Sequence, residues 1–340
     1  MLEKFDIGFS IYFENDGSFD EKLLDRFESA GGKYLFTSVN YRANEFHFDT
    51  LLKLVEAAHK RSMNVMVDIN GESSKTFDLE RIKSVGEVCL RMDDGISYEE
   101  IVGFQKDFDI VLNASTTSIA ELEKMQNMGL DSSRTLICHN FYPKPNTGLS
   151  LERVQKINAA YKERGFKLMT FVPGDLTMRG PIYKGLPTVE RHRDQDIIKS
   201  IMECLSADSD IVAVGDVDIK DESLQKIKNL QNGFMIAKAD VPDDIKNHVF
   251  YDRPDGAEEL VRDSTMRGKI DLTNDKISDT KNFERGDVVF STRDFGRYFG
   301  EIEIVKKPIM SDGRALVARI CEDDLWMLDY VSNKIGIKFE

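Results

Sequence analysis

The stretch Cys138-His139-Asn140-Phe141-Tyr142-Pro143 directly follows a short apolar run, Thr135-Leu136-Ile137, that predicts a buried strand. A helical pattern over residues 151–161 comes next, with Ser150 placed as its N-cap. An imidazole, an amide and a phenol therefore gather in a loop at the carboxyl end of a predicted strand. Ligands bind at that end when strands alternate with helices. A structural histidine is the alternative reading, but the crowding of polar groups favours a site. Its predicted members are His139, Asn140 and Tyr142.

The same pattern of a strand followed by an amphipathic helix recurs along the first two thirds of the chain. The predicted strands cover residues 5–13, 34–39, 64–69, 88–92, 108–112, 135–137, 166–172 and 211–215. Eight such units within about 230 residues predict a closed (β/α)₈ barrel of the TIM type, an α/β fold. An open doubly wound sheet is the alternative, but no Gly-x-Gly-x-x-Gly follows a predicted strand. We assign residues 1–235 to the barrel.

The remaining residues, 236–340, show a different pattern of apolar and turn-forming residues. Short β patterns separated by Gly and Asp occur around Phe290 and over residues 298–305, 315–320, 325–330 and 334–339. They predict a second, all-β domain, in the form of a small barrel. The segment 240–257, rich in Pro and Asp, is expected to be the linker.

Composition narrows the function classes. The 340 residues carry a formal net charge of −14, which argues against nucleic acid and anionic membrane as partners. The four cysteines are widely spaced, so no zinc knot or disulfide framework is predicted. The chain shows no signal peptide and no apolar run of membrane length, and we expect a cytoplasmic protein.

Carboxylates occur at the predicted carboxyl ends of several strands. Two carboxyls across a cleft are what glycoside cleavage needs, one protonated and one ionised. Salt bridges to nearby arginines are the alternative role for each of them. The candidate catalytic residues are Glu14, Asp68, Asp93 and Glu190, of which Asp68 and Asp93 lie on neighbouring strands.

A metal centre is a second interpretation of these residues, because Asp68, Asp93, His139 and Glu190 could form a mixed oxygen and nitrogen site. No two of them have the local spacing of a strong metal motif, so we expect no metal. A pyridoxal phosphate enzyme needs a lysine at a strand end, where the first strand instead ends in Ile11-Tyr12-Phe13-Glu14. We therefore expect no cofactor.

Recognition of an anionic small molecule remains compatible with the acidic chain if arginines gather locally. Guanidinium groups suit phosphate and carboxylate because their forked donors meet two oxygens together. Candidates in the barrel loops are Arg91, Arg179 and Arg193, and candidates in the second domain are Arg262 and Arg267. Further polar candidates for substrate binding are Asn40, Asn113 and His192.

Several of these motifs together resemble the 6-phospho-N-acetylmuramidase family, glycoside hydrolase family 170, formerly described as "outer surface proteins" of unknown function. The matching motifs are Cys138-His139-Asn140-Phe141-Tyr142-Pro143, Ile11-Tyr12-Phe13-Glu14, Arg91-Met92-Asp93-Asp94-Gly95, Glu190-Arg191-His192-Arg193, Val261-Arg262-Asp263-Ser264-Thr265-Met266-Arg267 and Phe295-Gly296-Arg297-Tyr298-Phe299-Gly300-Glu301. One departure is Asp216, where the family leads us to expect Asn, and we leave it out of the catalytic set.

The resemblance implies a barrel followed by a cyclophilin-like β domain. It also implies hydrolysis of N-acetylmuramic acid 6-phosphate linked β-1,4 to N-acetylglucosamine, in bacterial peptidoglycan recycling. The expected partner is that phosphorylated disaccharide, and a homodimer is possible. Two alternatives stay open: a non-catalytic sugar-phosphate sensor, and a metal-dependent sugar-phosphate isomerase or aldolase.

Overall fold

The structure is a computed structural model that describes residues 5–14, 17–38, 48–263, 265–269, 272 and 282–340. Asn40, one of the predicted binding residues, lies outside these ranges. The chain divides into two compact units, Met1–Gln225 and Lys226–Glu340.

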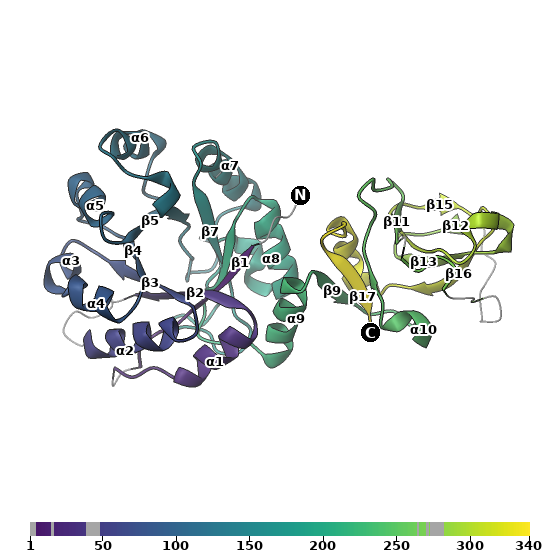
Figure 1. Ribbon diagram of the computed structural model, residues 1–340, viewed down its shortest axis with the longest axis horizontal. Coiled ribbons are helices and arrows are strands. Elements are labelled where there is room, and N and C mark those ends of the chain that lie inside the picture. The colour runs from purple at the N-terminus through teal and green to yellow at the C-terminus, as the bar shows by residue number, and fades with distance from the viewer. Residues whose placement is uncertain (1–4, 15–16, 39–47, 264, 270–271, 273–281) are drawn as a thin grey trace. The chain divides into compact units, whose positions relative to one another are not determined.

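The first unit contains a closed barrel of eight parallel strands in the order β1 to β8, with β8 pairing back to β1 (Figure 1). This confirms the predicted fold. The strands are β1 (Asp6–Ser10), β2 (Gly32–Ser38), β3 (Asn64–Ile69), β4 (Val88–Met92), β5 (Asp109–Asn113), β6 (Thr135–Cys138), β7 (Lys167–Val172) and β8 (Ile211–Val214).

Helices between consecutive strands form a ring outside the barrel (Figure 1). They are α1 (Glu21–Ser29), α2 (Phe48–His59), α3 (Ser73–Thr76), α4 (Leu79–Val85), α5 (Tyr98–Phe104), α6 (Ile119–Asn127), α7 (Leu151–Lys162) and α8 (Ile197–Ser206), with α9 (Asp221–Gln231) after β8. The side chain of Ser150 accepts a hydrogen bond from the backbone N–H of Arg153 and caps α7, as predicted. Ser118 and Glu121 form a capping box at the start of α6, and their side chains accept hydrogen bonds from backbone N–H groups at that helix end.

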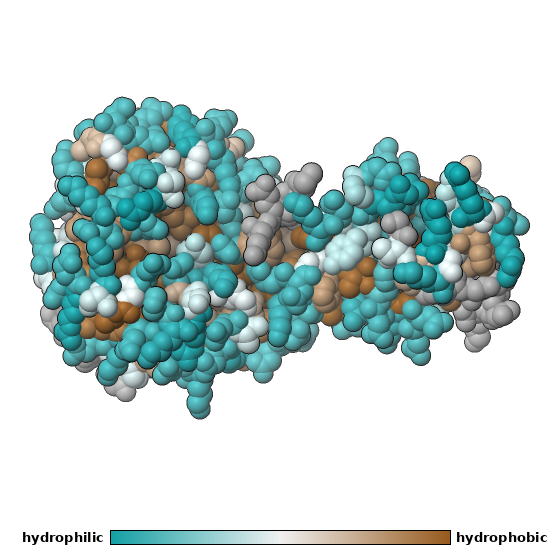
Figure 2. Space-filling model, viewed as in Figure 1, coloured by the Kyte–Doolittle hydropathy of each residue, from teal (hydrophilic) through white to brown (hydrophobic). Residues whose placement is uncertain are grey.

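The barrel interior is apolar. Its core consists of Phe36, Met66, Val111, Cys138, Met169, Phe171, Ile211 and Ala213, and all are buried. Tyr12 and Phe141, at strand ends, pack against this core. Figure 2 shows hydrophilic residues over most of the helical ring, with apolar residues gathered inside it. The polar side chains of a site must therefore come from the strand ends and the loops that follow them.

The second unit is built mainly of short strands, which confirms the predicted all-β C-terminal domain. One sheet has the order β11 (Leu260–Arg262), β14 (Ile302–Val305), β13 (Asp287–Ser291), β16 (Arg314–Arg319). A second has the order β10 (Val249–Phe250), β17 (Gly336–Phe339), β9 (Phe234–Ala237), and β12 (Asn282–Phe283) pairs with β15 (Ile309–Met310). Within the described ranges these are separate sheets and not one closed barrel.

Two local predictions for this unit are wrong. Residues 325–330 were predicted as a strand but fall largely in a 3₁₀ helix, Glu322–Asp329. The apolar side chains of Met327 and Leu328 are buried from this helix. The segment predicted as a linker, 240–257, contains α10 (Asp243–Lys246) and β10, which pairs with β17. No helix of the described residues is long and apolar enough to cross a membrane.

Candidate active site

A buried ion pair lies at the carboxyl ends of β3 and β4. The register of these strands places Asp68 beside Arg91, and Arg91 Nη1 donates a hydrogen bond to Asp68 Oδ1 at 2.6 Å. Arg91 Nη2 donates to Asn140 Oδ1 at 2.6 Å, and Asn113 Nδ2 donates to the same oxygen at 3.1 Å. Four residues of the predicted site, from four consecutive strand ends, are thereby joined in one network.

The carboxyl of Asp68 is buried beside charged groups of both signs. Burial raises the pKa of Asp68 above its ordinary value, although the charge and hydrogen bond of Arg91 act in the opposite direction. The nearby charge of Asp93 raises the pKa of Asp68 further, while Ser38 Oγ donates to Asp68 Oδ2 at 3.2 Å. Asp93 itself is only partly buried. The two carboxyls thus lie in different environments, and such a difference allows one carboxyl to act as an acid and the other as a base.

The backbone fixes how close these two carboxylates come. Asp93 N–H donates to the carbonyl of Ile69 at 2.8 Å, and Gly71 N–H donates to the carbonyl of Asp94 at 3.0 Å. A Cβ on Gly71 would stand 2.2 Å from the carbonyl oxygen of Gly95. Only glycine allows the two loops to approach this closely.

An arginine stacks on an aromatic side chain at the end of β1. The Arg179 guanidinium carbon lies 3.8 Å from the centre of the Tyr12 ring and 5.9 Å from that of Phe141. The Tyr12 hydroxyl donates to the carbonyl of Gly215 at 2.6 Å, and burial raises the pKa of Tyr12 to about 12 despite the opposing charge of Arg179. Tyr12 is therefore a neutral platform. Tyr12 belongs to the motif Ile11-Tyr12-Phe13-Glu14 at the first strand, which could have indicated its role. Only Glu14 of that motif was predicted to belong to the site.

Asp216 organises the loop after β7. Its Oδ2 accepts from the backbone N–H of Gly174 at 2.9 Å and of Leu186 at 3.0 Å, and its Oδ1 accepts from that of Arg179 at 2.9 Å. The residue is fully buried. One carboxylate thereby fixes the beginning, middle and end of the loop. Asp216 was left out of the predicted site because the resemblance led us to expect Asn at this position, so this role was not foreseen.

The same loop has an apolar outer surface. Leu176 is 53% exposed, Ile182 41% and Tyr183 65%, and in the described residues Met310 is the only other large apolar side chain so exposed. Tyr183 also has a positive φ of 55°, which is uncommon for a residue with a side chain. These residues lie on the same loop as Arg179 and were missed in the sequence, where they read as ordinary loop residues.

Glu190 and Arg193, two further residues of the predicted site, form an ion pair. Glu190 accepts from the backbone N–H groups of Asn146 at 2.8 Å and Gly148 at 2.7 Å, and from both Nε and Nη2 of Arg193. The hydrogen bonds from Arg193 lower the pKa of Glu190, and those from the two backbone N–H groups lower it further. Burial acts in the opposite direction, and the resulting pKa is about 2. Arg193 also donates to the carbonyl of Tyr142 at 3.0 Å. The pair joins the loops after β6 and β7.

Both candidate histidines are buried and contact polar side chains of the surrounding helices. His139 Nε2 lies 2.7 Å from Asn158 Oδ1 on α7, and burial lowers the pKa of His139 to about 4. His192 Nε2 lies 2.9 Å from Glu203 Oε2 on α8. Each histidine is 0% exposed. They pack between the barrel wall and its helices.

The His192 pair yields a prediction on stability. Burial disfavours the charged imidazole, but Cys204 and Glu203 favour it, and the pKa of His192 is raised to about 9. Since the folded pKa lies above the unfolded value, this stabilisation is complete below about pH 6.5 and is lost as the pH rises through about 9. Glu203→Gln is expected to lower the unfolding free energy at pH 6.5 by about 3–5 kcal/mol. It is also expected to flatten the pH dependence.

Urea unfolding at pH 6.5 and pH 9.5 measures both effects. Glu163→Gln is the control, because Glu163 is 77% exposed and only 4.0 Å from Arg164. An unchanged pH dependence in Glu203→Gln would show that the pair does not contribute to stability.

Of the remaining predicted residues of the barrel, Tyr142 lies near the network of Asp68 and Arg91, and Glu14 is exposed to solvent. Tyr142 Oη lies 3.3 Å from Ser115 Oγ after β5, near Asn113, whereas Glu14 is exposed in the turn after β1. The set proposed for a metal is not brought together, because His139 and Glu190 are engaged elsewhere. In the parts of the chain that the structure describes, no group of three or more His, Cys, Asp or Glu side chains could hold a metal ion.

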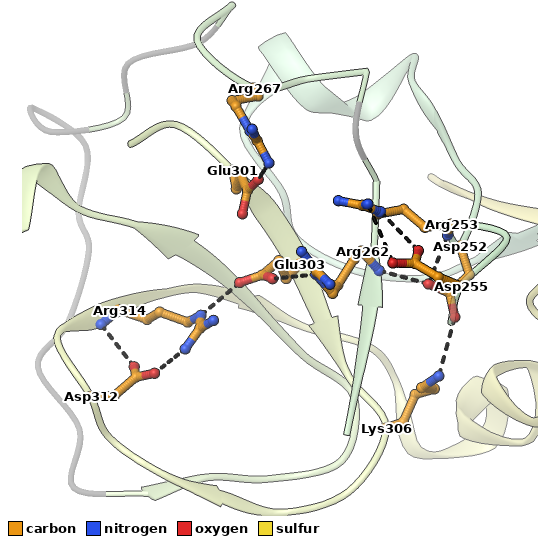
Figure 3. Close-up of polar contacts among 10 residues, drawn as sticks. All are labelled: Asp252, Arg253, Asp255, Arg262, Arg267, Glu301, Glu303, Lys306, Asp312 and Arg314. Carbon is orange, nitrogen blue, oxygen red and sulfur yellow. Dashed lines mark hydrogen bonds and ion pairs between the residues drawn. The ribbon is translucent and has the colours of Figure 1, made fainter. Parts of the chain in front are cut away.

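Arg262 and Arg267 lie in the second unit and contact buried glutamates on or next to β14. Arg262 Nε is 3.8 Å from Glu303 Oε1, and Arg267 Nη2 pairs with Glu301 Oε1 (Figure 3). The Arg267 guanidinium carbon also lies 5.2 Å from the ring centre of Tyr298.

Comparison with known proteins gives a consistent result for both units. Family models described as the N-terminal and C-terminal parts of 6-phospho-N-acetylmuramidase match residues 7–229 and 234–340. No curated protein matches the chain.

Two solved structures resemble the whole chain. One is a conserved protein of unknown function from a locus in Enterococcus faecalis, 26% identical with a TM-score of 0.79, covering 98% of this chain and 96% of that one. The other is an uncharacterized B. cereus protein, 25% identical with a TM-score of 0.74, covering 99% of this chain and 100% of that one.

Proposed function

Because this chain belongs to the 6-phospho-N-acetylmuramidase family, we propose that it hydrolyses the β-1,4 bond between N-acetylmuramic acid 6-phosphate and N-acetylglucosamine. The observation that supports this most is the pair Asp68 and Asp93 at neighbouring strand ends, of which Asp68 is buried with a raised pKa. A glycosidase needs two carboxyls in different environments, and Asp68 is buried whereas Asp93 is only partly buried.

In the proposed mechanism Asp68 is the general acid. Its proton passes to the glycosidic oxygen as the bond from that oxygen to C1 breaks, so N-acetylglucosamine leaves as a neutral alcohol. Arg91 and Asn140 hold the carboxyl of Asp68 in one orientation. Asp93, which is more exposed, either activates the water that attacks C1 or attacks C1 itself before water releases the sugar. If Asp93 is the base, it takes one proton from the attacking water, the hydroxyl joins C1, and proton exchange with solvent returns both carboxyls to their starting states. If Asp93 is the nucleophile, water adds its hydroxyl to C1 as the bond from C1 to Asp93 breaks, and its other proton passes to Asp68.

The other polar groups at the mouth are proposed to bind the sugar rings. Asn113 and Tyr142 offer hydrogen bonds to hydroxyl and acetamido groups. Arg179, held over the Tyr12 ring, is proposed to meet the lactyl carboxylate. A role in peptidoglycan recycling in the cytoplasm follows from the family and from a substrate that carries a phosphate, and it remains part of the proposal.

The test is incubation of the protein with the phosphorylated disaccharide, its dephosphorylated counterpart, and each again with a chelator. We expect release of both sugars from the phosphorylated disaccharide, unaffected by the chelator and much slower without the phosphate. Binding without turnover would favour the sugar-phosphate sensor. Turnover abolished by the chelator would favour the metal-dependent isomerase or aldolase. Either result would overturn the proposed function.

A further inference from the structure

The two carboxyl oxygens of Asp68 have different neighbours. Oδ1 accepts from Arg91 Nη1 at 2.6 Å, whereas Oδ2 accepts from Ser38 Oγ, at the carboxyl end of β2, at 3.2 Å. The register of β2, β3 and β4 places Ser38, Asp68 and Arg91 side by side. This asymmetry determines which of the two oxygens holds a proton when Asp68 is protonated.

Arg91 directs the proton of Asp68 to Oδ2. A guanidinium group can only donate hydrogen bonds, and the hydroxyl oxygen of a protonated carboxyl accepts them more weakly than the carbonyl oxygen does. The contact from Arg91 therefore favours Oδ1 as the carbonyl oxygen of the protonated carboxyl. The proton then belongs to Oδ2, beside the hydroxyl of Ser38.

A chain of hydrogen bonds holds Arg91 in this orientation. Arg91 Nη2 donates to Asn140 Oδ1 at 2.6 Å, and Asn113 Nδ2 donates to the same oxygen at 3.1 Å. Asn113 Oδ1 accepts from the backbone N–H of Ser115 at 2.9 Å. Because a backbone N–H can only donate, this contact fixes which way the Asn113 amide is turned. Arg91 and Asn113 are both buried, so solvent does not readily replace these contacts.

Ser38 can serve both protonation states of Asp68. A hydroxyl group is both a donor and an acceptor, and it rotates to suit its partner. The Ser38 hydroxyl can accept from the O–H of protonated Oδ2, and it can donate to Oδ2 once the proton has left. A guanidinium group, an ammonium group or a backbone N–H in the same place could serve only the ionised carboxyl.

We propose that Ser38 is a positioning residue of the barrel site, which holds the acidic proton on Oδ2 of Asp68 and turns to donate to that oxygen when the proton leaves. The proposal rests on the proposed function, in which the proton passes to the glycosidic oxygen as the bond from that oxygen to C1 breaks. Asp68 is then a carboxylate. The Ser38 O–H stabilises its charge at Oδ2 as Arg91 does at Oδ1.

The charged groups around Asp68 set the direction of the expected effect. Burial raises the pKa of Asp68, and the nearby charge of Asp93 raises it further. Arg91 and the hydrogen bond from Ser38 lower it. The Cys138 thiol on β6 also lies near Asp68, but burial raises the pKa of this thiol to about 11, so it is neutral. Removal of the Ser38 hydroxyl should therefore raise the pKa of Asp68.

The experiment compares Ser38→Ala with Ser38→Thr, which keeps the hydroxyl. In Ser38→Ala, kcat on the phosphorylated disaccharide should fall about 10-fold with KM within about twofold, and the basic limb of the pH–rate profile should move to higher pH. Ser38→Thr should restore the position of the limb and most of kcat. Titration of the Asp68 carboxyl by ¹³C NMR measures the same shift without substrate. It uses the full chain labelled in its aspartate carboxyls, with the Asp68 signal assigned from Asp68→Asn.

Ser133→Ala is the matched control. Ser133 Oγ also donates to a carboxylate, Asp131 Oδ1 at 2.7 Å, but it lies directly before β6, at the opposite end of the barrel from Asp68. This variant loses the same kind of hydrogen bond. It should leave kcat, KM and the titration of Asp68 unchanged.

Two results would overturn the proposal. If Asp68 titrates in Ser38→Ala at the same pH as in the parent protein, the hydroxyl does not act on the acid. If Ser38→Thr shows the full loss of Ser38→Ala, the loss comes from packing and not from the hydroxyl. The NMR titration does not depend on hydrolysis. A protein that fails to cleave the disaccharide, but in which Ser38→Ala moves the titration of Asp68 to higher pH, would refute the proposed function and leave the role of Ser38 standing.

Discussion

Asp68→Asn is expected to lower kcat on the phosphorylated disaccharide by about 10²-fold or more, because the amide cannot deliver a proton to the leaving oxygen. The parent enzyme should lose activity as the pH rises through the pKa of Asp68, which burial raises and the pairing with Arg91 opposes. In Asp68→Asn that basic limb of the pH–rate profile should disappear. Asp93→Asn should cause a comparable loss of kcat but retain the basic limb.

Glu190→Gln is the control for this result. Glu190 also belongs to a loop at the barrel mouth, but it accepts backbone N–H groups and Arg193, and its pKa is lowered to about 2. We expect reduced stability in this variant with kcat changed much less than in Asp68→Asn. Glu14→Gln should be near-native, because Glu14 is exposed. If Asp68, Asp93, Glu14 and Glu190 can all be replaced by amides with near-native activity, the mechanism is wrong.

Asp216→Ala is expected to destabilise the barrel unit by about 3 kcal/mol or more and to raise KM strongly. The change leaves three backbone N–H groups without an acceptor, two buried and one partly buried, and each buried group costs about 1–3 kcal/mol. The loop after β7 would lose its anchor, and with it the position of Arg179 over Tyr12. Urea unfolding and limited proteolysis of the loop measure the first effect, and steady-state kinetics measure the second.

Asp216→Asn distinguishes anchoring from catalysis at this position. An asparagine oxygen can still accept from Gly174 and Leu186, which share one carboxylate oxygen, and only the contact to Arg179 is lost. Most of the stability and activity should therefore be kept. A loss in Asp216→Asn as large as in Asp68→Asn would instead mean that Asp216 takes part in the chemistry.

The barrel could be predicted from the sequence because each of its strands is an apolar run buried on both faces and followed by an amphipathic helix. The second unit was harder, since its strands are short and some pair only through distant residues. β10 has two residues and forms only because β17, near the end of the chain, lies beside it. Nothing local in residues 249–250 indicates that pairing.

The site was predictable as far as strand ends determine it. Asp68, Arg91, Asn113 and Asn140 follow neighbouring strands, and the structure joins them in one network. The direction in which each side chain points could not be predicted from strand ends alone. His139 follows a strand as Asn140 does, yet Asn158 on α7 draws it away from the mouth. Its partner lies 19 residues further along the chain, and no spacing rule reveals it.

The central claim is that Asp68 and Asp93 catalyse hydrolysis of a glycosidic bond at the barrel mouth. The most direct test is to cleave the phosphorylated disaccharide in ¹⁸O-water and to weigh the products by mass spectrometry, with Asp68→Asn and Asp93→Asn in parallel. We predict one ¹⁸O atom at C1 of N-acetylmuramic acid 6-phosphate, unlabelled N-acetylglucosamine, and almost no product from either variant. Products without ¹⁸O, or labelled products formed at parent rates by both variants, would contradict it.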